Sequence, residues 1–241
     1  MDTKMSSITI GIPTRDRPNY LRDLLSALSV DDSGLLGEII IYDNGTHPET
    51  KAVSHRYGAM YLRGLKKQPG GRNEILRVTK GEIIYFLDDD CLPCGNIGRI
   101  LQVVWNGLSR ANTVAVGGPV ILSTFDCRPL VGMHDGRTYN RVLDGSSNLL
   151  EADHAQCWMP RTPTYVDFIP GGNMAFRTKE LINVGGFDET FGRGTSFREE
   201  TDPQLTLRQK GSKYSTTPPW RFGIVVPRKA EPDQKSRSSN N

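Results

Sequence analysis

The sequence of 241 residues lacks the features that would assign it to several large classes of protein. No apolar run reaches the roughly 18 residues that a membrane-spanning helix needs, and residues 1–7 contain no apolar signal core. Four cysteines are few for this length and fit a reducing compartment. A net charge of +3 is too small to argue for nucleic acid as a partner. We therefore expect a cytoplasmic protein that binds no nucleic acid and that could work close to a membrane surface.

What the chain does contain is an alternation of short strand and helix patterns. Apolar runs rich in strand-forming residues predict buried strands at residues 8–12, 38–42 and 83–87. Residues 18–28 carry leucines at i, i+3, i+4 and i+7, which is typical of one apolar helix face. This alternation predicts an α/β fold with a mostly parallel central sheet flanked by helices.

Further along the chain the pattern is broken by glycine and proline. Residues 69–71, Pro-Gly-Gly, predict a break before a helix at about 72–79. A strand is expected at 114–122, interrupted by Gly-Gly-Pro at 117–119. The last clear helix is expected to run through Lys210.

Three consecutive carboxylates, Asp88, Asp89 and Asp90, follow the strand at 83–87. Because unpaired charges are costly to bury, they should lie where the strand emerges at its carboxyl end, where open α/β sheets bind ligands. Alternate residues of a strand point to one side, so Asp88 and Asp90 should grip one object together while Asp89 faces away. A hard cation, Mg²⁺ or Mn²⁺, takes such oxygen ligands. The alternative is a solvated loop.

Seven short motifs follow one another along the chain. They are Ile10-Gly-Ile-Pro-Thr14-Arg, Ile41-Tyr-Asp43-Asn-Gly-Thr, Gly71-Arg-Asn73, Phe86-Leu-Asp-Asp-Asp90, Gly171-Gly-Asn-Met-Ala-Phe-Arg177, Gly185-Gly-Phe-Asp188 and Glu199-Glu-Thr-Asp202. Together they closely resemble the GT-A glycosyltransferases of family 2. The resemblance implies one GT-A domain over residues 1–227, with a nucleotide-binding half at 6–122, an acceptor half at 123–227 and a disordered tail at 228–241.

The resemblance implies a metal-dependent enzyme that moves a sugar, with inversion, from a UDP- or dTDP-sugar to an acceptor hydroxyl. The acceptor would be a glycan, a lipid-linked sugar or a small molecule. Thr14, Arg15 and Arg72 match positions near the nucleotide. Asp43 matches a carboxylate that accepts a hydrogen bond from the base, and uracil and thymine both offer an N3–H.

In the same comparison, Asp88 and Asp90 match the DXD motif, with Asp90 the main ligand of Mn²⁺ or Mg²⁺ and Asp88 close to the ribose and the metal. Asp89 belongs to the nucleotide-binding motif and is the member we expect to be structural. Gly172 and Asn173 match a segment at the junction of donor sugar and acceptor. Many relatives have a further histidine ligand after the last helix, and no histidine occurs here beyond residue 154.

The second acidic cluster supplies candidates for the general base. Counting back from Gly211 places Glu200 on the family's catalytic carboxylate and Glu199 on its acidic neighbour. Asp202 is the rival base, although Pro203 fits the first position of a helix and would make Asp202 its N-cap. A positioned carboxylate of this kind removes the proton of the attacking hydroxyl.

Other interpretations remain open at this stage. The chain could be a sugar nucleotidyltransferase or a non-catalytic module that binds nucleotide sugars. Cys91 and Cys94 could form a redox pair, or a zinc site with Cys127 and Cys157. The long segment at 123–164 shows neither the helical nor the strand pattern of apolar residues. Long loops of this kind often bind ligands, so we expect acceptor recognition there, with His134 and His154 as candidate contacts.

Overall fold

The computed structural model of the protein describes residues 7–93, 95–118, 120–124, 128–129, 169, 171–193, 199–216 and 224–227. The helices are α1 (Pro18–Leu28), α2 (Glu49–Arg56), α3 (Gln68–Val78), α4 (Ile97–Leu108), α5 (Thr178–Asn183), the 3₁₀ helix η2 (Glu189–Arg193) and α6 (Thr201–Gln209). The strands are β1 (Ile8–Thr14), β2 (Leu36–Asp43), β3 (Met60–Arg63), β4 (Ile83–Leu87), β5 (Leu92–Pro93), β6 (Thr113–Gly117), β7 (Val120–Thr124), β8 (Arg128–Pro129), β9 (Asn173–Arg177), β10 (Lys213–Thr216) and β11 (Ile224–Pro227).

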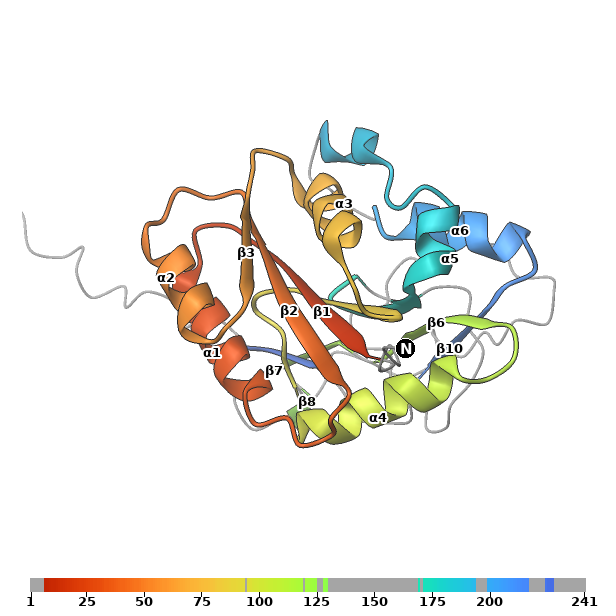
Figure 1. The fold of residues 1–241 in the computed structure, drawn as a ribbon, viewed down its shortest axis with the longest axis horizontal. Helices are drawn as coiled ribbons and strands as arrows, with labels where there is room; N and C mark the ends of the chain where they lie inside the picture. The colour runs from red at the N-terminus through yellow and green to blue at the C-terminus, as the bar shows by residue number, and fades with distance from the viewer. Residues whose placement is uncertain are drawn as a thin grey trace, which may run out of the picture.

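A seven-stranded central sheet organises these elements, in the order β10-β6-β9-β4-β1-β2-β3 (Figure 1). Strands β1 to β4 run parallel, and β6 and β10 are parallel to each other. Strand β9 runs antiparallel to both of its neighbours, β4 and β6. A smaller sheet has the order β5-β11-β7-β8. The α/β fold with a mostly parallel central sheet is therefore confirmed.

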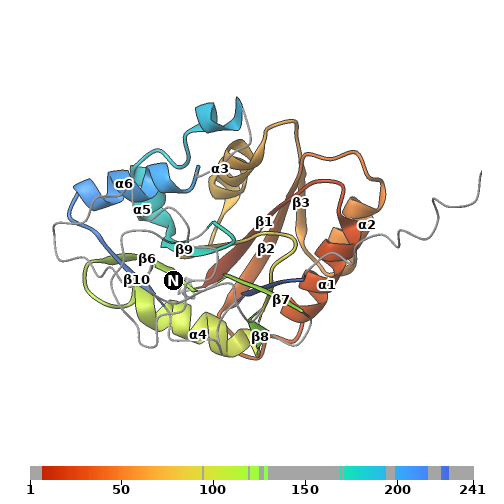
Figure 2. The same ribbon diagram turned by 180° about the vertical axis from the view of Figure 1, so that it is seen from behind.

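Helices cover both faces of the central sheet, which explains why the strand-forming runs do not alternate with polar residues. In β4, Ile83, Tyr85 and Leu87 pack into a core with α1, α2 and α4. The intervening Ile84 and Phe86 pack into a second core with α3, α5 and α6. Figure 1 shows α4 below the sheet and α3, α5 and α6 above it, and Figure 2 shows the same layers from behind.

Helix α3 begins earlier than the sequence predicted. It starts at Gln68 and takes Pro69, Gly70 and Gly71 into its first turn instead of following them. Proline is tolerated there because the first N–H groups of a helix have no partner within it. Gly71 is needed because the ring of Tyr42 lies against it, and an added Cβ would come 2.9 Å from Tyr42 Cε1. The predicted break is therefore the start of the helix.

The strand expected at residues 114–122 is two strands in different sheets. Its first part is β6 in the central sheet, and its second part is β7, which pairs with β11 in the smaller sheet. The interruption expected at residues 117–119 coincides with this change: Gly117 ends β6, and β7 begins at Val120. Of the helices that the structure describes, none is both long and apolar enough to cross a membrane.

Candidate active site

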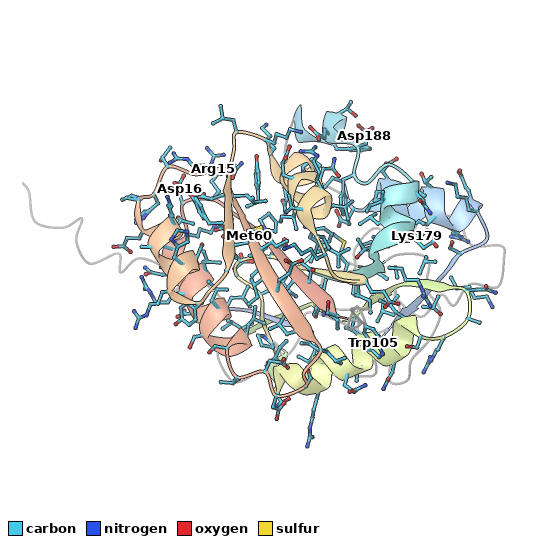
Figure 3. The ribbon with its side chains drawn as sticks, viewed as in Figure 1. Arg15, Asp16, Met60, Trp105, Lys179 and Asp188 are labelled. Atoms are coloured by element: carbon cyan, nitrogen blue, oxygen red, sulfur yellow. The ribbon has the colours of Figure 1, made fainter. Side chains whose placement is uncertain are left out.

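A pocket of about 510 Å³ lies at the carboxyl ends of β1, β2 and β4. Five residues predicted from the sequence to belong to the site line it, namely Thr14, Arg15, Asp88, Asp89 and Asp90. The loop between β3 and α3 and the first residue of α3 complete it with Lys66, Lys67 and Gln68. Figure 3 places Arg15 and Asp16 at this edge and Trp105 of α4 on the opposite side of the molecule. The predicted binding edge of the sheet is thus a real cavity.

Asp89 and Asp90 share one arginine that the sequence analysis did not single out. Arg17 Nη1 donates to Asp89 Oδ1 at 3.1 Å and to Asp90 Oδ2 at 3.0 Å. The Thr14 hydroxyl donates to Asp89 Oδ2 at 2.7 Å. Burial raises the pKa of Asp89 to about 6, against the opposing effects of Thr14 and Arg17. Asp89 is bound into the pocket wall, which agrees with its expected structural role, while its contact with a nucleotide stays a prediction.

Asp88 turns toward α3. Its Oδ1 accepts hydrogen bonds from Gln68 Nε2 at 3.0 Å and from Arg72 Nη2 at 3.1 Å. Its Oδ2 faces Gly172, where an added Cβ would lie 3.3 Å away. Strand β4 ends at Leu87 and the chain then turns. Strict alternation therefore does not extend to these residues: Asp90 shares Arg17 with Asp89, while Asp88 contacts α3, and all three carboxylates line one pocket.

The chemistry of this pocket fits a hard divalent cation. The pKa of Asp90 is raised by burial and next by the negative charge of Asp88, and Arg17 opposes that rise. A cation between the two carboxylates would relieve their repulsion. Among the described residues no three His, Cys, Asp or Glu side chains are arranged to hold a metal. Phosphates of a substrate and water would have to complete the coordination, as Mg²⁺ commonly requires.

Asp43 is buried just behind the pocket, at the end of β2. Its Oδ1 accepts from the backbone N–H of Gly45 at 2.7 Å, and its Oδ2 accepts from the Tyr61 hydroxyl at 2.9 Å. Burial, followed by this hydrogen bond, raises the pKa of Tyr61 to about 12, so its hydroxyl stays a donor. Each carboxylate oxygen has a second lone pair for a base N–H. The predicted contact with uracil or thymine stays a prediction.

Arg72 lies beneath the pocket with 1% of its surface exposed. Its Nη1 donates to Glu199 Oε1 at 2.5 Å, and its Nη2 donates to Asp88 and to the carbonyl of Gly171 at 3.3 Å. Its Nε is buried and has no hydrogen-bond partner among the described residues. Arg72 therefore connects α3 to Asp88 in the pocket and to Glu199 in the second acidic cluster. Its predicted contact with the nucleotide stays a prediction.

The two glutamates before α6 occupy different environments. Glu199 is 3% exposed, and burial raises its pKa while the Arg72 guanidinium opposes that rise. Glu200 is half-buried, and its carboxylate lies beside Gly171, where an added Cβ would come 3.3 Å from Glu200 Oε1. Among the described residues, no ion pair holds Glu200. Glu199 is thus held by Arg72, and the predicted role of Glu200 as the base stays a prediction.

Asp202 does not take the N-cap position that we expected. Helix α6 begins at Thr201, with Glu200 as the residue before it, so Asp202 is the second helical residue and Pro203 the third. Proline anywhere in the first turn is tolerated, which is why its position misled the prediction. Burial, and then the charge of Asp188, raises the pKa of Asp202. The charge of Asp188, which Figure 3 labels, therefore acts on Asp202, whereas Glu200 lies beside Gly171.

The Gly171-Gly172 segment separates the two sets of acids. Its second glycine lies against Asp88 and against Cys91 Sγ, at 3.1 Å from an added Cβ. Asn173 begins β9 and is buried, and its Oδ1 accepts from the Tyr85 hydroxyl at 2.6 Å. Burial, followed by the charge of Asp88, raises the pKa of Cys91 well above its usual value, which favours the thiol.

Several predictions concern residues outside the described part of the chain. These are the roles of Cys94, Cys127, Cys157, His134 and His154, most of the segment at 123–164, and the tail from residue 228. Conversely, Arg17 and Gln68 line the pocket but were not predicted from the sequence. Arg17 stands in the polar turn three residues after Thr14, which could have suggested it. Gln68 carried no such signal, because its place depends on where α3 begins.

Comparison with known proteins gives one family and several solved structures. Residues 9–102 match the model of glycosyl transferase family 2. The segment covers β1 to β5 and the first half of α4, and it includes the three pocket carboxylates. No curated protein matches the chain. The predicted family resemblance is therefore confirmed over residues 9–102.

Two solved structures share the fold at low sequence identity. One is the mannosyltransferase PcManGT from Pyrobaculum calidifontis in complex with GDP-Man and Mn²⁺, at 17% identity and a TM-score of 0.60, covering 96% of this chain and 59% of the other. The second is residues 1–349 of TarS from S. aureus, at 13% identity and a TM-score of 0.62, covering 92% and 60%. The chain thus spans about three fifths of the length of these proteins, and the likeness extends the fold agreement beyond residue 102.

Proposed function

We propose that this chain, whose residues 9–102 match the model of glycosyl transferase family 2, is a glycosyltransferase. Its sugar donor would be a nucleoside diphosphate sugar. One observation carries the proposal. Asp88, which lines the pocket, and Glu200, which does not, flank the same glycine pair, Gly171-Gly172. A donor bound in the pocket through its phosphates would therefore present its sugar toward a half-buried carboxylate.

In this proposal Glu200 is the general base. The acceptor hydroxyl must lose its proton as its oxygen attacks the anomeric carbon, from the face opposite the leaving nucleoside diphosphate, which inverts the configuration. A positioned carboxylate contributes about 10²–10⁴-fold to such a step. Glu199 cannot serve, because its carboxylate is buried against Arg72. Asp202 is the weaker candidate, because it is Glu200 whose carboxylate lies against the glycine pair.

Asp88 and Asp90 would hold Mn²⁺ or Mg²⁺, because they supply hard oxygen ligands inside the pocket. When bound, the cation would neutralise charge that develops on the leaving diphosphate. The residues of the chain perform the remaining tasks. Thr14 and Arg17 fix Asp89 in the wall, and Gln68 orients Asp88.

The donor base would be uracil or thymine, read by Asp43. Tyr61 and Gly45 hold this carboxylate in one orientation, which supports a fixed acceptor of a base N–H. The mannosyltransferase from Pyrobaculum calidifontis was solved with GDP-Man, so a guanine donor is the alternative that must be tested. The acceptor would be a glycan, a lipid-linked sugar or a small molecule, and the proposed location is the cytoplasm.

A thermal-shift screen of the full chain tests the donor. A ligand at a hundred times its Kd stabilises a protein by about 2.7 kcal/mol, which is readily measured. We expect UDP- or dTDP-sugars to raise the melting temperature, and Mn²⁺ to increase the shift. If GDP-sugars alone raised it, the role of Asp43 would be wrong. Release of nucleotide from the donor would further distinguish a transferase from a module that only binds nucleotide sugars.

A further inference from the structure

Arg17 binds a carboxylate that a metal ion would also need, that of Asp90. Its single nitrogen Nη1 bridges Asp89 Oδ1 and Asp90 Oδ2, at 3.1 and 3.0 Å. The other oxygen of Asp90 faces the sulfur of Cys91, with Cys91 Sγ and Asp90 Oδ1 4.0 Å apart. Cys91 is buried, whereas 44% of the Arg17 side chain is exposed. A cation bound to Asp90 would lie beside the guanidinium of Arg17, and the two positive charges would repel each other. Of the two partners of Asp90, Arg17 is the one whose side chain has room to leave.

If Arg17 left Asp90, its guanidinium would still lie in the pocket where the donor is proposed to bind. It lines the same pocket as the three aspartates, in the turn between β1 and α1. That turn is pinned by Asp16, whose Oδ1 accepts from the backbone N–H groups of Thr46 and His47 at 2.6 and 2.8 Å. The backbone at Arg17 is therefore held in place while its long side chain can change direction. A guanidinium is well suited to bind phosphate oxygens in pairs.

We propose that Arg17 and the divalent cation compete for Asp90, and that Arg17 passes to the diphosphate of the donor when the cation binds. The inference rests on the proposed function, because it assumes a diphosphate in the pocket. Arg17 then has opposite effects on two ligands. It weakens binding of the cation alone, and it strengthens binding of the nucleotide diphosphate in the presence of the cation. A purely structural residue would support both or neither.

The test compares the full-length protein with Arg17→Gln and measures two affinities. The first is the Kd for Mn²⁺ alone, followed by the electron paramagnetic resonance signal of free Mn²⁺. Because the lost ion pair is half exposed, we expect Mn²⁺ to bind about 3- to 10-fold more tightly to the variant. The second is the Kd for UDP with saturating Mn²⁺, measured by calorimetry. This affinity should fall about tenfold or more, because a charge-assisted contact to phosphate is lost.

Arg22→Gln is the matched control. Arg22 lies on α1, contacts Glu49 and Asn19, and is remote from the carboxylates of the pocket, so neither affinity should change. Arg17→Lys keeps the charge without the fork of donors and should give smaller changes in both directions. Melting temperatures of all variants report whether each is folded. Asp90→Asn in the Arg17→Gln background should abolish the gain in Mn²⁺ binding.

If Arg17→Gln bound Mn²⁺ as tightly as the wild type or more weakly, the proposed competition would be wrong. If it bound Mn²⁺ more tightly but UDP with unchanged affinity, the proposed transfer of Arg17 to the diphosphate would be wrong. Failure of either protein to bind Mn²⁺ would also overturn it. These outcomes differ from failure of the proposed function, which would appear as absence of sugar transfer from any nucleotide sugar, whatever the metal affinities are.

Discussion

Two acidic clusters lie on either side of the Gly171-Gly172 segment, and their charges are balanced by arginines in different environments. Asp89 and Asp90 face a pocket and share Arg17, whose side chain is half exposed. Glu199 faces the interior and is paired with Arg72, which is almost fully buried. The exposed partner of the first pair has room to move, while that of the second does not. We therefore propose that the pocket cluster serves binding and that the buried pair serves positioning.

The buried pair also explains why adjacent glutamates differ. Arg72 fixes Glu199 and thereby the start of α6, so Glu200 is held next to Gly171 without an ion pair of its own among the described residues. The same arginine contacts Asp88. One buried side chain therefore sets the relative position of the donor-side carboxylate and the proposed base.

The largest effect should come from breaking the buried pair. Arg72→Met leaves the Glu199 carboxylate buried without its partner, and removal of one member of a buried ion pair typically costs about 3–5 kcal/mol. We expect the free energy of unfolding in urea to fall by an amount in that range. Arg77→Met on the same helix is the control, because Arg77 is exposed and pairs with Glu74 at the surface, where such pairs contribute little.

A double variant shows whether the charge or the packing matters. If Arg72→Met combined with Glu199→Met recovers much of the lost stability, the cost arises from the uncompensated carboxylate. An Arg72→Met protein as stable as the wild type would contradict the idea of a buried anchor.

A smaller effect is expected from alanine at Gly171 or Gly172, and the two variants should affect different steps. A Cβ at residue 171 would crowd Glu200, and a Cβ at residue 172 would crowd Asp88 and Cys91, each at 3.1–3.3 Å. We expect Gly171→Ala to lower the rate of sugar transfer about tenfold with little change in UDP affinity, because small misplacements of a base are costly. Gly172→Ala should chiefly weaken binding of UDP with Mn²⁺. Identical effects of the two variants would contradict the assigned division.

The smallest expected effect concerns Asp16 and depends on pH. Two backbone N–H groups, from Thr46 and then His47, lower the pKa of Asp16 below its usual 3.8. The charged carboxylate therefore stabilises the folded state above pH 3.8, and this contribution is lost as the pH falls through the lowered pKa. Asp16 has a φ of 53°, which asparagine also tolerates, so Asp16→Asn is a conservative test. The urea midpoint of Asp16→Asn should be lower than that of the wild type at pH 6, and the difference should vanish in acid. A difference independent of pH would contradict this account.

Local patterns were sufficient to predict the strands that carry the pocket. The apolar run of β4 is contiguous and ends at Leu87, directly before Asp88. Its burial and the emergence of the carboxylates therefore follow from neighbouring residues. The sequence could not reveal that β9 lies antiparallel between β4 and β6, because strand order depends on contacts between distant segments. The pairing of Arg72 with Glu199, which are 127 residues apart, was hidden for the same reason.

Where the prediction relied on an ideal rule, the rule failed at the end of an element. Alternation was extended from β4 to Asp90, but the strand stops at Leu87. Proline was taken to mark the first position of α6 and a break before α3, but it occupies the third position of one helix and the second of the other. Turns and helix ends are set by the competition of several contacts, so single residues indicate them poorly.

Nucleotide release from a nucleotide sugar by Glu200→Gln tests the central claim most directly. The donor is first identified by thermal shift, and release of the nucleoside diphosphate with Mn²⁺ is then followed for the wild type, Glu200→Gln and Asp202→Asn. We expect Glu200→Gln to lose about 10²–10⁴-fold in rate while it binds the donor as the wild type does, and Asp202→Asn to retain most of the activity. Near-normal turnover of Glu200→Gln, or a loss confined to Asp202→Asn, would contradict the assignment of Glu200 as the base.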